Sequence, residues 1–186
     1  MDAEFNRAIR SDIGDVLVNW TRKYDKKPAF EILIEILKSG SLSGSGGFIK
    51  GGYKCVCFTE TPLAELVKVF SVSKSINDRY EPYGIGVRKQ WLFEKGGRPV
   101  IYSPEDEYRH LDDKIKWRYV KYSPPQIDFS WEREWRICCE KLELDPLNCV
   151  VIVPTRKHAR EVTNKYGDHW FTICLSVLGL PMDLSS

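Results

Sequence analysis

Short apolar segments with strand-like composition dominate this chain, and they do not alternate regularly with helical segments. A regular alternation of strand and helix would favour a parallel α/β sheet, whereas a mixed order is typical of the α+β class. We therefore predict a single domain over residues 1–186, with a split or bent, mostly antiparallel sheet and flanking helices. The strands are expected at residues 15–21, 53–59, 83–88, 99–102, 129–140, 149–153 and 170–175.

Three segments carry the pattern of an amphipathic helix. In residues 29–38 apolar side chains recur at three- and four-residue steps, and Gly40 follows as the usual C-terminal stop. Thr155 and Gly167 bracket a second helix as its cap and its end. A third helix is expected to open at Thr61-Pro62. Its buried stripe comprises Leu63, Leu66, Val67 and Phe70.

Two segments between these elements lack a clear period. Residues 41–47 are mostly serine and glycine, and they are predicted to form a flexible loop. Residues 104–125 are charged and aromatic, and we expect a helix or a long loop there.

Charge and cysteine usage limit the partners that we expect. Lys and Arg number 28 against 26 Asp and Glu, so the net charge of +2 does not by itself indicate nucleic-acid binding. No apolar run reaches the ~20 residues that a membrane-spanning helix needs, and the acidic residues 1–5 do not resemble a signal peptide. The six cysteines include the neighbours Cys138 and Cys139, which favours reduced, buried thiols over a disulfide framework. We therefore expect a cytoplasmic protein without a membrane partner.

Common cofactor and metal motifs are missing from the sequence. It contains neither of the glycine-rich motifs that hold phosphates. His110, His158 and His169 are scattered, and their spacing from the cysteines is not that of a zinc site, so no metal is expected. A nuclease or other hydrolase that works without a cofactor would need a histidine or a metal cluster, and it is disfavoured for the same reason.

Aromatic residues make up 12% of the chain, including six Trp and nine Tyr. Such side chains either fill the core or form a cleft that stacks flat rings such as a base or a nicotinamide. In residues 109–121 they are interleaved with Lys and Arg, so Trp117, Arg118 and Tyr119 are candidate contacts to an acceptor substrate. The acidic neighbours of this segment leave a solvated charged face as the alternative.

The most informative segment is residues 131–140, which reads Trp-Glu-Arg-Glu-Trp-Arg-Ile-Cys-Cys-Glu. Alternation along a strand would place Glu132, Glu134 and Arg136 on one face. Two carboxylates and a guanidinium are costly to bury without partners, so they suit a cleft that solvent reaches. The alternative is a Glu134–Arg136 ion pair on an outer face.

Two further polar segments stand at the ends of predicted elements. Asn19-Trp20-Thr21-Arg22 ends the first strand, and Phe58-Thr59-Glu60-Thr61 joins a buried strand to the start of a helix. Hydroxyls and free backbone N–H groups at a helix start suit an anion. Simple capping by Thr59 and Thr61 is the alternative.

Taken in order, these segments resemble the AbiGi-type abortive phage-infection family over about residues 15–140. The resemblance is carried by Cys57-Phe58-Thr59-Glu60-Thr61-Pro62, then Tyr83-Gly84-Ile85-Gly86, then Glu132-Arg133-Glu134-Trp135-Arg136. The order is also similar to that of mono-ADP-ribosyltransferases, which carry a His or Arg, a Ser/Thr or aromatic, and a catalytic Glu on successive core strands. The resemblance implies an ADP-ribosyltransferase-like fold, NAD as co-substrate, and a role as a toxin in bacterial anti-phage defence.

The resemblance also implies roles for individual residues. Glu134 matches the catalytic glutamate, and Glu132 matches the first glutamate of the pair, which orients or deprotonates the acceptor. Arg136 would bind the pyrophosphate or keep Glu134 ionised. The remaining NAD contacts would come from Asn19, Trp20, Thr21 and Arg22 near the adenosine ribose, from Phe58 and Thr59 near the nicotinamide ribose, and from Tyr83 against the nicotinamide. Asn19 stands where the transferases have His, so Arg22 is a candidate substitute.

Two functions from different classes follow. The first is an NAD-dependent ADP-ribosyltransferase that releases nicotinamide and modifies a nucleic acid, either RNA or DNA, or a protein, with a cognate antitoxin or chaperone as a further partner. The second is a non-catalytic antitoxin or sensor subunit that uses the same fold to bind a protein. A binding module has no need for Glu132, Glu134 and Arg136 to converge with Thr59 and Asn19, so their convergence is the discriminating feature.

Overall fold

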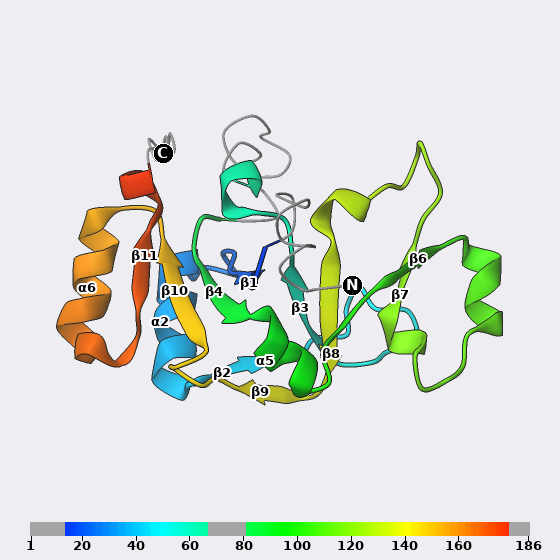
Figure 1. Ribbon diagram of the computed structural model, residues 1–186, viewed down its shortest axis with the longest axis horizontal. Coiled ribbons are helices and arrows are strands. Elements are labelled where there is room, and N and C mark those ends of the chain that lie inside the picture. Colours follow the sequence, from blue (N-terminus) through cyan, green and yellow to red (C-terminus); the bar gives the residue numbers. More distant parts are fainter. Residues whose placement is uncertain (1–13, 67–80, 179–186) are drawn as a thin grey trace, which may run out of the picture. The chain divides into compact units, whose positions relative to one another are not determined.

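The computed structural model describes residues 14–66 and 81–178 (Figure 1). Its contacts divide the chain into two compact units. Within the described residues, unit 1 comprises 14–17, 42–61 and 88–143, and unit 2 comprises 18–41, 62–66, 81–87 and 144–178. The boundary falls within β1 (Val16–Trp20). Residues 1–5 and the predicted helix positions Val67 and Phe70 lie outside the described part of the chain.

Unit 1 is built around an antiparallel ladder in which β8 (Glu134–Cys138) lies between β3 (Cys55–Thr59) and β5 (Arg98–Pro99). Cys55 faces Cys138 and Thr59 faces Glu134 across β3 and β8. Because side chains alternate along a strand, Glu134, Arg136 and Cys138 share one face of β8. Trp135 and Ile137 point to the other face.

Two smaller ladders and several short helical elements also belong to unit 1. β6 (Ile101–Ser103) runs parallel to β7 (Tyr119–Lys121), and β2 (Ser41–Ser43), which enters the unit at Leu42, pairs with β9 (Lys141–Glu143). The helical elements are α5 (Lys89–Glu94) and the 3-10 helices η1 (Glu105–His110), η2 (Lys116–Arg118) and η3 (Ser130–Glu132). Residues 104–125, predicted as a helix or a loop, therefore divide into η1, η2 and β7 with turns between them.

The predicted strand over residues 129–140 is wrong in its first half. Ser130–Glu132 form η3, and Arg133 follows with a φ of 46°, which lies in the left-handed region. Only Glu134–Cys138 is extended as β8. Strand alternation therefore does not place Glu132 on the β8 face that carries Glu134 and Arg136.

Unit 2 contains a mixed ladder with helices beside it. β10 (Cys149–Val153) pairs antiparallel with β4 (Gly84–Arg88) and parallel with β11 (Thr172–Cys174). α6 (Arg156–Tyr166) packs against β10 and β11 (Figure 1). The Tyr166 hydroxyl donates a hydrogen bond of 3.1 Å to the Ile34 carbonyl of α2 (Ala29–Ser39), which ties the two helices together. The 3-10 helices η4 (Gly167–His169) and η5 (Leu175–Leu178) also lie in this unit.

Local capping signals explain where α2 and α6 begin and end. Pro28 precedes α2, and Gly40 ends it with a φ of 63°. The Thr155 hydroxyl accepts a hydrogen bond from the His158 N–H at the start of α6, and Gly167 closes that helix with a φ of 61°. Both predicted helices are confirmed. Their ends follow from local chemistry, because glycine adopts positive φ without steric cost and threonine satisfies a free N–H.

Both units bury an apolar core. The buried side chains of unit 1 include Leu42, Val56, Phe58, Leu92, Trp135 and Ile137. Those of unit 2 include Leu33, Leu37, Ile85, Val87, Val151, Ile152 and Val162. Strands pair mostly antiparallel with helices beside them, so the α+β class is confirmed.

Candidate functional site

Glu134 and Arg136 form a buried, doubly hydrogen-bonded ion pair on one face of β8. The Arg136 Nε donates to Glu134 Oε1 at 2.7 Å, and its Nη2 donates to Oε2 at 3.1 Å. The Glu134 side chain is 13% exposed and the Arg136 side chain 7%. The sequence predicted this pair on an outer face as one alternative. The pair exists, but it lies inside unit 1 rather than on a solvated surface.

Arg136 also holds the segment that contains η2 and β7. Its Nη1 donates to the Trp117 carbonyl at 3.0 Å and to the Tyr119 carbonyl at 2.9 Å. Burial alone would lower the pKa of Arg136, but the hydrogen bonds and charge of Glu134 outweigh it and hold that pKa above its usual value. A guanidinium with these contacts is well suited to position Glu134, and it has little donor capacity left for a pyrophosphate.

Two threonine hydroxyls hold the turn that precedes β8. Thr59, which faces Glu134 across the ladder, donates through Oγ1 to the Glu132 carbonyl. Thr61 Oγ1 donates to the Trp131 carbonyl at 2.5 Å, and the Thr61 N–H donates to Thr59 Oγ1 at 3.2 Å. The Phe58-Thr59-Glu60-Thr61 segment therefore sets the backbone from which Glu132 and Glu134 project.

Tyr102 fixes the first residue of β8. Its hydroxyl accepts a hydrogen bond of 3.0 Å from the Glu134 N–H and donates to the Phe129 carbonyl at 3.2 Å. Burial raises the pKa of Tyr102 to about 12, so the hydroxyl stays protonated at neutral pH. Sequence reasoning did not select this residue, because neither of its contacts has a sequence spacing that would reveal it.

A second largely buried glutamate, Glu60, lies on the opposite face of the same ladder, beside Lys89 and Trp135. Phe58 is buried there opposite Trp135. Glu60 accepts from the Lys89 ammonium and, at 3.0 Å, from the Trp135 indole N–H. The Glu60 side chain is 12% exposed. Sequence reasoning named the segment around Glu60 but did not assign that carboxylate; the nearest signal was a glutamate directly after an apolar strand.

The segment predicted to contact an acceptor is engaged within unit 1. The Trp117 indole donates to the Lys114 carbonyl at 2.8 Å, and Arg118 Nε donates to the Pro99 carbonyl at 2.9 Å. Burial, followed by the charge of Arg98, lowers the pKa of Arg118. Tyr119 is only 3% exposed, and its ring packs edge-on against Tyr108. This geometry favours a packing role for Tyr119 over base stacking.

The basic residues around this segment are paired with acids. Glu105 accepts hydrogen bonds from Lys50 at 3.0 Å and from Lys121 at 2.5 Å. Those hydrogen bonds, with Lys121 contributing most, lower the pKa of Glu105 to about 2. Lys116 pairs with Asp113 at 2.5 Å. A mixed, solvated charged face is therefore a better description of this surface than a basic patch.

Five candidate residues belong to unit 2, where two hydrogen bonds join Thr21 to the Tyr83 carbonyl. The Thr21 N–H and Oγ1 donate to the Tyr83 carbonyl at 2.8 Å and 3.0 Å. Both side chains are buried. Asn19 and Trp20 lie on β1, and the Asn19 carbonyl would be 2.7 Å from a Cβ at Gly84, so only glycine allows this approach. Arg22 follows β1 and is exposed.

Tyr83 belongs to a ring cluster with two residues that sequence reasoning missed. The His158 ring lies 4.5 Å from Phe30 and 5.3 Å from Tyr83, measured between centroids. His158 Nδ1 is 2.9 Å from Thr155 Oγ1 and 3.5 Å from the Tyr83 hydroxyl. Burial raises the pKa of Tyr83 to about 12. Burial lowers the pKa of His158; the charge of Glu161 opposes this shift and the charge of Lys157 adds to it.

We expect His158 to make the stability of the protein depend on pH. Its folded-state pKa lies below the ordinary value of about 6.5, so the unfolded chain binds the proton more readily. The free energy of unfolding should therefore fall as the pH drops through that ordinary value. Urea unfolding at about pH 7.5 and about pH 5.5 measures the change. His158→Gln should reduce the difference and the matched variant His110→Gln should not; an equal difference in both would contradict the prediction.

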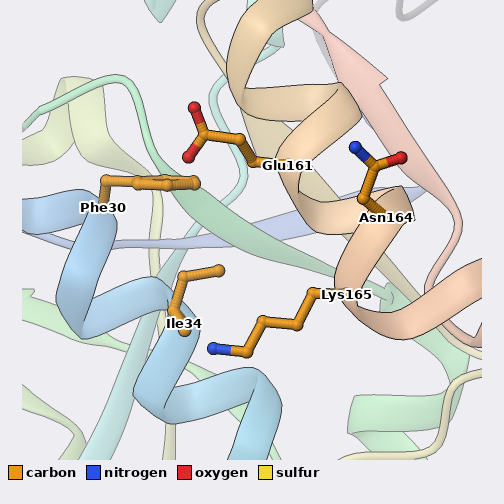
Figure 2. A pocket seen from close by; sticks show the side chains of 5 residues that line it. All are labelled: Phe30, Ile34, Glu161, Asn164 and Lys165. Carbon is orange, nitrogen blue, oxygen red and sulfur yellow. The ribbon is translucent and has the colours of Figure 1, made fainter.

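A shallow groove of about 370 Å³ lies between α2 and α6 in unit 2 (Figure 2). Phe30 and Ile34 line it from α2, and Glu161, Asn164 and Lys165 line it from α6. It offers an aromatic ring beside one acidic and one basic side chain. Phe30 also belongs to the ring cluster, but none of the predicted site residues lines the groove.

The candidate residues thus fall into two sets. Unit 1 holds Phe58, Thr59, Glu132, Glu134 and Arg136 on or beside the β3–β8 ladder, together with Trp117, Arg118 and Tyr119, whereas unit 2 holds Asn19, Trp20, Thr21, Arg22 and Tyr83. Over residues 14–66 and 81–178, no group of three or more His, Cys, Asp or Glu side chains is arranged to hold a metal ion. Within the same ranges, the helices are too short or too polar to span a bilayer.

The chain matches no protein-family model, no curated protein and no solved structure at a significant level. The resemblance to the AbiGi-type family and to the transferases therefore stays a prediction, which rests on the sequence motifs alone.

Proposed function

We propose that this chain is an NAD-dependent mono-ADP-ribosyltransferase with an ADP-ribosyltransferase-like fold. It would act as a toxin in bacterial anti-phage defence and transfer ADP-ribose to a nucleic acid or a protein. One observation carries the proposal: Thr59 and Glu134 face each other at the end of the β3–β8 ladder. The motif resemblance predicts this relation, in which the second-motif threonine supports the catalytic glutamate.

The chemistry fits a carboxylate that is held in place. Breaking the bond between nicotinamide and C1′ of the ribose sends the bonding electrons to nicotinamide and leaves an oxocarbenium-like sugar. A fixed carboxylate that accepts from the ribose 2′-hydroxyl and faces this cation stabilises the transition state more than the ground state. Glu134 is suited to this task, because its two oxygens accept one hydrogen bond each from Arg136 and retain further lone pairs. An acceptor nucleophile then bonds to C1′ and loses its proton.

Arg136 and Glu132 take supporting roles in this proposal. Arg136 keeps Glu134 ionised and oriented, which is the better of its two predicted roles, since its other contacts are the backbone carbonyls of η2 and β7. Glu132 would orient or deprotonate the acceptor from the η3 turn, whose carbonyl Thr59 holds. Neither role requires the two glutamates to share a strand face.

A second candidate function, a non-catalytic antitoxin or sensor subunit, is favoured by the burial of the Glu134–Arg136 pair. Its side chains are 13% and 7% exposed, and the guanidinium also binds backbone carbonyls. A buried pair with these contacts can equally serve a structural role, in which it links β8 to β7. In that case Glu134 contributes to stability and has no role in NAD turnover.

Labelled NAD separates the two functions. The purified chain is incubated with NAD carrying label in the adenosine half, together with total RNA, DNA or protein, and both nicotinamide release and label transfer are measured. We expect label in one fraction, which identifies the acceptor class. Glu134→Gln should lower the rate at least about 100-fold while circular dichroism shows a folded protein.

Glu60→Gln is the matched control. Glu60 is also a largely buried, hydrogen-bonded glutamate, but it lies on the opposite face of the ladder. It should therefore keep the wild-type rate. Intact NAD in every fraction would favour the binding subunit over the enzyme. Turnover that falls equally in both variants would instead contradict the catalytic role of Glu134.

A further inference from the structure

Two cysteines, one on β3 and one on β8, face each other at the end of the ladder opposite to Thr59. Cys55 and Cys138 are directly opposite in register. The Cys139 N–H donates to the Lys54 carbonyl at 3.0 Å, which makes Lys54 and Cys139 a hydrogen-bonded position. The next pair, Cys55 and Cys138, is therefore non-hydrogen-bonded, the position in which opposite Cα atoms are closest, at about 4.5 Å.

This separation lies within the range that a disulfide spans, roughly 4.4–6.8 Å between Cα atoms. Cys139 follows β8, where it is opposite Lys54, and its thiol donates to the Ile137 carbonyl at 3.9 Å. Cys57 lies on the same face as Cys55, but it is opposite Arg136. Cys138 is therefore the cysteine whose register matches Cys55.

The two thiols differ sharply in access to solvent. Cys138 is exposed, in contrast to the buried thiol that the sequence predicted, whereas Cys55 is 1% exposed. Burial, with a further contribution from Cys138, raises the pKa of Cys55 to about 12. An oxidant from solution therefore meets Cys138 first, and Cys55 is protected from external reagents but adjacent to the oxidised sulfur.

We propose that Cys55 and Cys138 form a reversible, oxidant-driven disulfide, with Cys138 as the reacting thiol and Cys55 as the resolving thiol. With hydrogen peroxide, the Cys138 thiolate attacks one oxygen and becomes a sulfenic acid, and hydroxide leaves. Cys55 then attacks the Cys138 sulfur, and water leaves as the disulfide forms. In total, two thiols lose two electrons and two protons, and peroxide is reduced to two waters. A thiol reductant reverses the reaction by exchange.

This inference does not depend on the proposed enzymatic function, because its test measures covalent structure. Reduced protein is treated with hydrogen peroxide, free thiols are blocked with a maleimide after denaturation, and tryptic peptides are analysed without reductant. Each relevant peptide carries a second cysteine, Cys57 or Cys139, so fragmentation spectra must assign the bond. We expect a Cys55–Cys138 cross-link that disappears after treatment with dithiothreitol.

Two serine variants make the assignment independent of the spectra. Cys138→Ser should lose the cross-link, whereas Cys139→Ser should form it to the same extent as the wild type. Both positions reach solvent, so neither substitution opens a cavity in the core. A Cys138–Cys139 bond, a disulfide-linked dimer, or oxidation that stops at Cys138 without a cross-link would overturn the proposal.

Discussion

Replacing Arg136 with methionine is expected to lower the free energy of unfolding by about 3–5 kcal/mol. Methionine keeps most of the volume of the side chain and removes its charge and its donors. The Glu134 side chain, which is 13% exposed in the native pair, would then lose its cation. The backbone carbonyls of Trp117 and Tyr119 would lose the hydrogen bonds that Nη1 donates at 3.0 Å and 2.9 Å. An uncompensated charge and unsatisfied acceptors inside a unit are among the few single changes with effects of this size.

Urea unfolding, followed by tryptophan fluorescence, measures this loss. The double variant Glu134→Leu with Arg136→Met is the control, because it removes both charges together. It should recover most of the lost stability, because replacing a buried ion pair with apolar side chains often leaves the free energy of unfolding unchanged. If Arg136→Met unfolds at the same urea concentration as the wild type, the pair is solvated in solution. A double variant as unstable as the single one would instead assign the loss to the carbonyls of η2 and β7.

The Glu134–Arg136 pair shows which features of the candidate site can be predicted from the sequence. Alternation correctly placed Glu134 and Arg136 on one face of a strand, because the two-residue period of a strand is local. It did not reveal their burial, which depends on partners distant in sequence. The acceptors of Arg136 Nη1 are backbone carbonyls 17 and 19 residues away, and a carbonyl carries no sequence signature. The hydrogen bond between Glu60 and Trp135 joins two side chains that are 75 residues apart, so no local pattern could predict it.

The elements show the same division between local and distant causes. Gly40 and Thr155 mark the ends of α2 and α6 through their own backbone and hydroxyl chemistry, so both helices were predicted. α5 was missed, because its six residues are too few for a helical period to emerge. The break at Arg133 was also missed: arginine at a φ of 46° is held there by its surroundings rather than by its type.

A further expected result concerns residues 41–47, which the sequence predicted to be a flexible loop. That prediction is wrong for Ser41–Ser43, which form β2 and pair with β9. Gly44→Ala should lower the free energy of unfolding by about 3 kcal/mol. A Cβ at Gly44 would lie 2.0 Å from the Cys139 carbonyl oxygen and 3.4 Å from the Cys55 nitrogen, so the backbone would have to move apart. The Gly44 N–H also donates to the Glu140 carbonyl at 2.8 Å, and the Ser45 N–H donates to the Cys55 carbonyl at 2.9 Å.

Gly47→Ala in the same segment is the matched control. A Cβ at Gly47 would meet nothing within 4 Å, and its φ is not positive, so the native backbone accepts alanine. This variant should be neutral or more stable by about 0.4–1 kcal/mol, because alanine restricts the unfolded chain. Thermal and urea unfolding of both variants give the comparison. Equal stability of the two would mean that this segment is as flexible as its composition suggests; a selective loss at Gly44 would mean that the close approach to Cys139 fixes it against the end of β8.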